Sequence, residues 1–260
     1  MIKFFRKIRQ NLLMENKTSK YFKYAIGEII LVVIGILIAL QINNWNENRK
    51  QKVKEIDALE NIKTSLLADL KLYNGIFKVR LGWKEKGLEY LKEVAYYKRK
   101  VPEDSIFKNY FDMDTDIVFR YDSGSYDALK SLGFDLIQNK ELRKKIINTY
   151  QILLPSYMGF INDELDRAEP LEKEYKKDLL KDYVTKNKKN KLVVWVDFKV
   201  DNVIEHPSFL ALLRLEQGKY NNYISRIKVV RSFSEELIKE IENELQLLKE
   251  SKKTAPSKND

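Results

Sequence analysis

An apolar run near the amino terminus constrains this chain more than any other feature. From Ala25 the sequence reads AIGEIILVVIGILIALQI, which contains twelve Ile, Leu or Val residues and a single charge. The 22 residues from Tyr24 to Trp45 would form a helix of about 33 Å, enough to cross the hydrocarbon core of a bilayer. The twelve aliphatic side chains favour insertion by about 4–7 kcal/mol. We therefore predict one transmembrane helix over residues 25–43.

The flanks of this run distinguish a membrane anchor from a buried core helix and from a cleaved signal peptide. Tyr24 and Trp45 stand at its two ends, where aromatic side chains favour the headgroup region. Glu28 lies one turn from the basic end, so water and headgroups reach it and its cost stays below about 3 kcal/mol. Clustered cations before the run argue against a core helix. The QINNWNE segment after it has no small-x-small cleavage pattern, which favours an uncleaved signal anchor.

Two smaller features accompany the anchor. Gly35 and Ala39 lie four residues apart, a spacing that lets a second helix approach closely, although such pairs also arise by chance. Residues 2–13 alternate basic and apolar side chains, which fits an interfacial amphipathic helix or a frayed basic tail. The residues predicted to contact lipid headgroups are Lys3, Arg6, Lys7 and Arg9.

The distribution of charge predicts an orientation and argues against nucleic-acid binding. The first 23 residues hold seven Lys or Arg, and the flank directly after Trp45 holds four, Arg49, Lys50, Lys52 and Lys54. This excess places the amino terminus in the cytoplasm and the large domain outside. Half of the net charge of +10 lies in the first 43 residues, beside the lipid headgroups. The predicted organisation is a basic cytoplasmic segment 1–24, the transmembrane helix 25–43, a helical extramembrane domain 44–250 and a disordered tail 251–260.

The large domain has the pattern of long helices. Only nine Gly and five Pro occur in 260 residues, too few for the turns of a β-rich fold. Apolar residues recur at steps of three and four from Ile56 to Ala95, and Gly82 and Gly87 are candidate bends. A second stripe begins after Pro207, which suits a first helical position, and it reads Phe209, Leu212, Glu216, Tyr220, Tyr223, Ile227, Val230, Leu237, Ile241, Leu245 and Leu248.

Shorter helices are expected between these two stripes. Ser123 is the predicted cap of one that Gly133 closes, and Asn139 that of another running to Leu154 before Pro155. A third is expected over 156–184, with a kink at Pro170. The predicted fold class is mainly α, an antiparallel long-helix bundle after one transmembrane helix.

One segment departs from the helical period. LVVWVDFKV at 192–200 alternates like a strand. A single strand has no hydrogen-bonded neighbour, so we expect either pairing with DIVFR at 116–120 or an extended packed loop. The basic KNKKNK before it is interpreted as a solvated turn.

No residue pattern predicts a catalytic, cofactor or metal site. Asp112, Asp114 and Asp116 resemble the opening of a calcium loop, but Ile117 stands where the loop needs glycine and Ser123 where it needs a carboxylate. These aspartates are therefore interpreted as an acidic solvated loop. His206, the only histidine, precedes Pro207 and is interpreted as a helix-boundary residue. The chain has no cysteine, no G-x-S-x-G elbow and no phosphate-binding glycine loop.

Three segments carry a resemblance to a known family. MIKFFRKIRQNLL, KYAIGEIILVVIGILIALQINNWNE and SYDALKSLGFDLIQNKELRKKIINTY resemble an uncharacterised family of single-pass membrane proteins from Gram-negative bacteria, which has a domain of unknown function. The resemblance implies one transmembrane helix, a mostly helical extramembrane region and no assigned activity.

The leading functional hypothesis is a non-enzymatic, membrane-anchored interaction or scaffold protein with a periplasmic bundle on the inner membrane. Its expected partners are the lipid bilayer and either another protein or a second copy. We expect no nucleic acid, no cofactor and no small-molecule ligand. Two alternatives stay open: an extracytoplasmic sensor working with a separate signalling chain, and an envelope hydrolase whose carboxylates converge only in three dimensions.

Overall fold

The computed structural model describes residues 18–253 of the chain. The predicted headgroup contacts of Lys3, Arg6, Lys7 and Arg9, and the predicted amphipathic helix over 2–13, lie outside the described residues. The chain divides into two compact units, and the boundary between them lies between Glu55 and Ile56. Almost every described element is a helix and the exception is one two-stranded sheet, which confirms the mainly α fold class.

The first unit contains the apolar run, within helix α2 (Thr18–Leu72). Its large aliphatic side chains from Ile26 to Ile42 are all exposed by about half of their surface. A core helix of a soluble protein would bury them, so this exposure argues against that alternative. Among the described residues this is the one helix long and apolar enough to cross a membrane. Gly35 and Ala39 lie on it exposed, and close approach of a second helix there stays a prediction.

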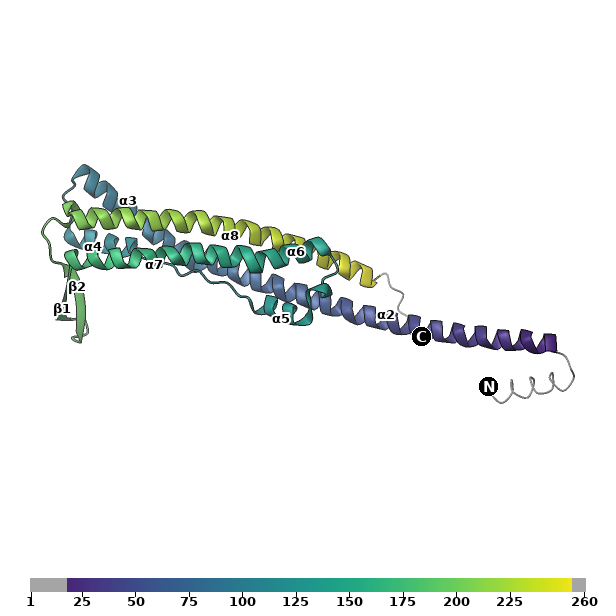
Figure 1. The fold of residues 1–260 in the computed structure, drawn as a ribbon. Helices are drawn as coiled ribbons and strands as arrows, with labels where there is room; N and C mark the ends of the chain where they lie inside the picture. The colour runs from purple at the N-terminus through teal and green to yellow at the C-terminus, as the bar shows by residue number, and fades with distance from the viewer. Residues whose placement is uncertain (1–17, 254–260) are drawn as a thin grey trace. The chain divides into compact units, whose positions relative to one another are not determined.

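The second unit is an antiparallel bundle of long helices. Figure 1 shows α8 running alongside α7 and α3, in the opposite direction to both. In chain order the elements after α2 are the π-helical turn η1 (Tyr73–Phe77), α3 (Lys78–Tyr97), α4 (Glu103–Met113), α5 (Gly124–Leu132), the 3₁₀ turn η2 (Phe134–Leu136), α6 (Lys140–Asn148), the π-helical turn η3 (Thr149–Leu153), α7 (Leu154–Leu179), strands β1 (Leu180–Lys186) and β2 (Leu192–Phe198), the 3₁₀ turn η4 (Val203–Glu205) and α8 (Pro207–Lys253).

Several predicted helix ends are confirmed. The Asn139 side chain accepts hydrogen bonds from the backbone N–H groups of the first turn of α6, both at 3.2 Å. Gly133 ends α5 with a φ of 94°, a conformation that glycine adopts without strain. Pro207 is the first residue of α8. Ser123 precedes α5, but its hydroxyl donates to the Asp127 side chain at 2.9 Å and makes no cap hydrogen bond to the backbone.

Other predicted boundaries are wrong. The predicted helix does not end before Pro155, because the π-helical turn η3 leads directly into α7, of which Pro155 is the second residue. Residues 180–184 are a strand and not the end of a helix. Gly82 and Gly87 both lie inside the uninterrupted α3. Residues 251–253 belong to α8, and the rest of the predicted tail lies outside the described residues.

The strand over 192–198 is confirmed, and its predicted partner is wrong. β2 pairs in antiparallel register with β1, with Tyr183 opposite Trp195 and Val184 opposite Val194. Residues 116–120 belong to neither a strand nor a helix. The Asn162 side chain takes the place of a neighbouring strand, since its amide accepts from the Phe119 N–H at 3.0 Å and donates to the Phe119 carbonyl at 3.1 Å.

The core of the bundle consists of two hydrophobic clusters. One contains Leu81, Tyr223 and Ile227, and the other contains Leu88 and Leu212. Along α3 the two clusters are separated by Lys84, and along α8 by Glu216 and Lys219, all with no exposed side-chain surface. A layer of charge therefore lies between two apolar regions of the same bundle.

Candidate functional site

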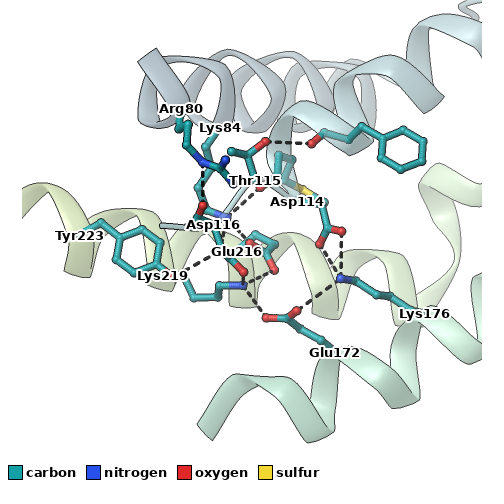
Figure 2. A network of polar contacts seen from close by, with 12 residues as sticks. Arg80, Lys84, Asp114, Thr115, Asp116, Glu172, Lys176, Glu216, Lys219 and Tyr223 are labelled. Carbon is teal, nitrogen blue, oxygen red and sulfur yellow. Dashed lines mark hydrogen bonds and ion pairs between the residues drawn. The ribbon is translucent and has the colours of Figure 1, made fainter. Parts of the chain in front are cut away.

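Seven buried or partly buried charged side chains of this bundle form one connected group, which we call the ionic layer. Figure 2 shows side chains from α3, α7, α8 and the segment after α4 converging on it. Its members come from segments up to 132 positions apart in the sequence. The members of the ionic layer are Lys84, Asp114, Asp116, Glu172, Lys176, Glu216 and Lys219.

Lys84 joins α3 to α8 and to the end of α4. Its ammonium donates to Glu216 Oε2, to the Met113 carbonyl at 2.8 Å and to Asp116 Oδ1 at 3.3 Å. Three acceptors satisfy the three N–H groups of an ammonium. The site therefore holds a fully buried cation with no donor left over.

Lys219 has the equivalent place on α8. Its ammonium donates to Asp116 Oδ2 at 2.7 Å, Glu172 Oε1 at 2.5 Å and Glu216 Oε1 at 3.0 Å. Tyr223, one turn further along α8, donates its hydroxyl proton to Asp116 Oδ1 at 3.2 Å. Asp116 and Glu216 each accept from both buried lysines, so the two cations share their carboxylates.

The third cation, Lys176 of α7, lies at the edge of the layer. Its ammonium is 2.6 Å from Asp114 Oδ1, and it donates to Glu172 Oε2 at 3.3 Å. Tyr110 is buried nearby, and its hydroxyl has no hydrogen-bond partner among the described residues. Burial and the negative charges of Asp114 and Glu216 raise the pKa of Tyr110, so its hydroxyl stays neutral.

Burial and charge act in opposite directions on the pKa values of the layer. Burial raises the pKa of Glu216 and of Asp114 despite their contacts with ammonium groups. Burial acts the same way on Asp116, but Lys84 and Lys219 outweigh it and lower its pKa. Burial disfavours the Lys219 ammonium, yet Glu216 and Asp116 raise its pKa. Lys219 is therefore charged at neutral pH, and its positive charge compensates the carboxylates around it.

The layer offers oxygen donors in a spacing that a metal ion could use. Carboxylate oxygens of Asp114, Glu172 and Glu216 lie within 4.8 Å of one another. Each of these carboxylates already accepts from at least one lysine. A divalent cation would have to displace ammonium groups or add buried positive charge. We interpret the layer as a structural element that fixes how the helices pair, a role attested for buried polar groups in helical bundles.

The positions of two charged residues in the sequence indicate this layer. Glu216 stands at a core position of the second apolar stripe, between Leu212 and Tyr220, and Lys84 follows Leu81 by three residues. A charged residue at an apolar stripe position points into the core, where it needs a partner of opposite charge. The interpretation of Asp114 and Asp116 as part of a solvated loop is wrong, because both are held in the layer.

The other predicted residues lie outside the ionic layer. His206 is a boundary residue, as predicted, and its Nδ1 accepts from the Ser208 N–H at 3.2 Å at the start of α8. Tyr24, Glu28, Gly35, Ala39 and Trp45 all lie on α2 in the first unit. The Arg49 guanidinium lies 5.9 Å from the centre of the Trp45 ring, a pairing that places a cation beside the ring face.

A second buried acid lies apart from the ionic layer. Both carboxylate oxygens of Asp69, on α2, accept from the Asp122 backbone N–H, at 3.2 and 3.3 Å. Tyr73 and Tyr150, which flank this carboxyl, are buried. Burial raises the pKa of Asp69 from 3.8 to about 6, against the opposing effect of the Asp122 N–H. The folded protein therefore holds this proton at pH values where the unfolded chain has lost it.

Replacing Asp69 with asparagine, which carries no charge, is expected to raise the free energy of unfolding by about 1–2 kcal/mol near pH 7. In the wild type, stability should fall as the pH rises from about 4 to about 6, because only the folded state still binds the proton there. The gain from the variant should therefore vanish near pH ~4. Urea unfolding of both proteins at the two ends of this pH range measures it.

The matched control is Asp163→Asn, at an exposed aspartate on α7. It should change the free energy of unfolding by less than about 0.5 kcal/mol at either pH. A gain for Asp69→Asn that does not change with pH would contradict the assignment of a raised pKa to this carboxyl.

Comparison with known proteins adds a family but no activity. A family model described as "Family of unknown function (DUF6090)" matches residues 28–167, more than half of the chain. The chain belongs to this family. The DUF6090 match contains most of the apolar run together with Lys84, Asp114 and Asp116, while the α7 and α8 members of the ionic layer follow it. No curated protein and no solved structure matched the chain.

Proposed function

We propose that this DUF6090 protein is a single-pass membrane protein whose helical bundle is an interaction module without catalytic activity. The anchor would be the exposed apolar part of α2. The seven cations before it favour a cytoplasmic amino terminus, with the bundle in the periplasm of a bacterial inner membrane. The anchored bundle would then act as a scaffold that contacts another component of the envelope.

The observation that carries this proposal is the β1–β2 hairpin. Five large apolar side chains on it are between 40% and 72% exposed, although the rest of the bundle buries two full clusters of such residues. Exposed apolar side chains concentrated on one element mark an interaction site. The residues are Tyr183, Val184, Leu192, Val194 and Trp195.

The convergent carboxylates of the ionic layer do not favour the hydrolase alternative. A catalytic acid or base has to reach a substrate proton directly or through one water. The layer's carboxylates are engaged by lysines of the bundle itself, and none of its members lines the described cavities of about 600, 450 and 330 Å³.

Single-cysteine labelling tests both parts of the proposal, because the chain has no native cysteine. Cysteine is introduced at Ser156, which is exposed on α7, or at Val194 on the hairpin. A membrane-impermeant maleimide should label Ser156→Cys in intact cells. It should label Val194→Cys more slowly in cells than in the purified protein, because the partner covers the hairpin.

Two results would overturn the proposal in different ways. Labelling of Ser156→Cys only after lysis would place the bundle in the cytoplasm. Equal labelling of Val194→Cys in cells and in purified protein would mean that nothing covers the hairpin.

A further inference from the structure

The hairpin is attached firmly to the bundle. Its base residues Leu179 and Phe198 are buried in the core, and the Phe198 ring contacts the rings of Phe107 and Tyr110 edge-on. The Lys199 N–H donates to the Leu179 carbonyl at 2.9 Å, which closes the base. An isolated two-stranded hairpin is marginal in water, so this buried base is what holds the exposed outer half in place.

The outer half of the hairpin is apolar on both faces. Residues directly opposite each other in an antiparallel pair share a face. Tyr183 and Trp195 therefore lie on one face, and Val184 and Val194 lie on the other. A ribbon with one face on a core and one in water would alternate apolar and polar residues. This hairpin lacks that alternation, which suits a surrounding medium that is itself partly apolar.

The tip of the hairpin is strongly basic and ordered. Between Tyr183 and Val196 the sequence holds four lysines and no acid. The Asn187 side chain accepts from the N–H groups of two tip residues, at 2.9 and 3.1 Å, and so fixes the turn. None of these ammonium groups has an acidic partner among the residues that the structure describes. The lysines are Lys186, Lys188, Lys189 and Lys191.

We propose that the hairpin is a binding site for the surface of an anionic phospholipid bilayer, an inference that rests on the proposed interaction function and names its partner. Lysines attract anionic headgroups, while tryptophan and tyrosine favour the interface between headgroups and acyl chains. The unpaired backbone groups on both strand edges need water or headgroups, so the hairpin lies in the interface and does not cross the hydrocarbon core.

Charge selects this partner over a second copy of the chain. Two hairpins pairing through their outer halves would bring two clusters of unpaired lysines together, which costs free energy. An anionic headgroup layer compensates the same lysines and also accepts the apolar side chains beside them. An anionic bilayer surface therefore matches both the positive charge and the exposed apolar side chains of the hairpin.

The test uses the full chain in nanodiscs of phosphatidylcholine, mixed with separate vesicles that do or do not contain phosphatidylglycerol. Capture of the nanodiscs should be at least about tenfold greater on the anionic vesicles. Lys188→Glu with Lys189→Glu should remove that preference, and Leu192→Ser with Val194→Ser should weaken it severalfold. The matched control is Lys130→Glu with Lys239→Glu, the same charge change at exposed helical positions, and it should bind like the wild type.

Tryptophan emission gives an independent measurement. The chain has three tryptophans, so Trp45→Phe with Trp83→Phe leaves Trp195 as the only reporter. Its emission should shift to shorter wavelength with anionic vesicles and stay unchanged with phosphatidylcholine alone. An emission that stays unchanged with anionic vesicles would overturn the proposal.

Three further results would also overturn it. Hairpin variants that bind as well as the wild type would assign the binding to the basic amino-terminal segment. Nanodiscs that pair without vesicles, and lose that pairing in the hairpin variants, would identify a second copy as the occupant. Protection of Val194→Cys in cells, without any vesicle binding by purified protein, would refute the lipid partner and leave the interaction function standing.

Discussion

Replacing Glu216 with alanine is expected to lower the free energy of unfolding by about 3–5 kcal/mol, the largest effect of any substitution considered. Glu216 is fully buried and accepts from both Lys84 and Lys219. Its removal leaves two buried ammonium groups with one acceptor fewer each and shifts the layer toward excess positive charge. Urea unfolding of the detergent-solubilised full chain, followed by circular dichroism, measures the loss.

The control for this change is Glu236→Ala. Glu236 is 3.1 Å from Lys145, but the Glu236 side chain is 66% exposed. An ion pair in water contributes little, so this variant should lose less than about 1 kcal/mol. Similar losses for the two variants would show that water screens the ionic layer as it screens the surface.

Replacing Gly87 with alanine is expected to cost about 3 kcal/mol. A Cβ at this position would lie 2.5 Å from the Asn109 carbonyl oxygen and 2.6 Å from the Met113 backbone nitrogen, both on α4. Backbone atoms cannot rotate away as a flexible side chain can, so α3 and α4 would have to separate. That movement would also draw the Met113 carbonyl away from the Lys84 ammonium.

The same helix supplies the control. A Cβ at Gly82 meets no atom within 4 Å, and alanine favours a helix over glycine by about 1 kcal/mol. Gly82→Ala should therefore stabilise the protein slightly while Gly87→Ala destabilises it. Thermal unfolding of Gly82→Ala, Gly87→Ala and the wild type under identical conditions measures both effects. Equal effects would contradict the close approach of α3 and α4 at Gly87.

Structural features that depend on residues adjacent in the sequence, such as helix ends and single strands, were predictable. The Asn139 cap and the Pro207 start follow from the chemistry of one residue at a helix end. The strand over 192–198 follows from a period of two. Which segment pairs with this strand was harder to predict. Residues 116–120 have a strand-like composition, but the Asn162 amide forms hydrogen bonds with the backbone of this segment in place of a second strand. The adjacent segment β1 pairs with β2 instead, across a turn of five residues, 187–191.

The ionic layer shows the limit of local reasoning most clearly. Glu216 and Lys84 are 132 positions apart, and each alone is an ordinary charged residue of a helix. Their positions on the apolar stripes were visible in the sequence. Which carboxylate would meet which ammonium was not, since that depends on how α3, α4, α7 and α8 pack.

The sequence by itself determined the apolar segment on α2, the mainly helical fold and family membership. The first two follow from transfer free energies and backbone preferences that add up along contiguous residues, and family membership follows from sequence similarity. Tertiary structure alone decided the pKa of Asp69, the mutual compensation in the ionic layer and the exposure of the hairpin. Each of these depends on which distant segments exclude water from a side chain and which leave it accessible.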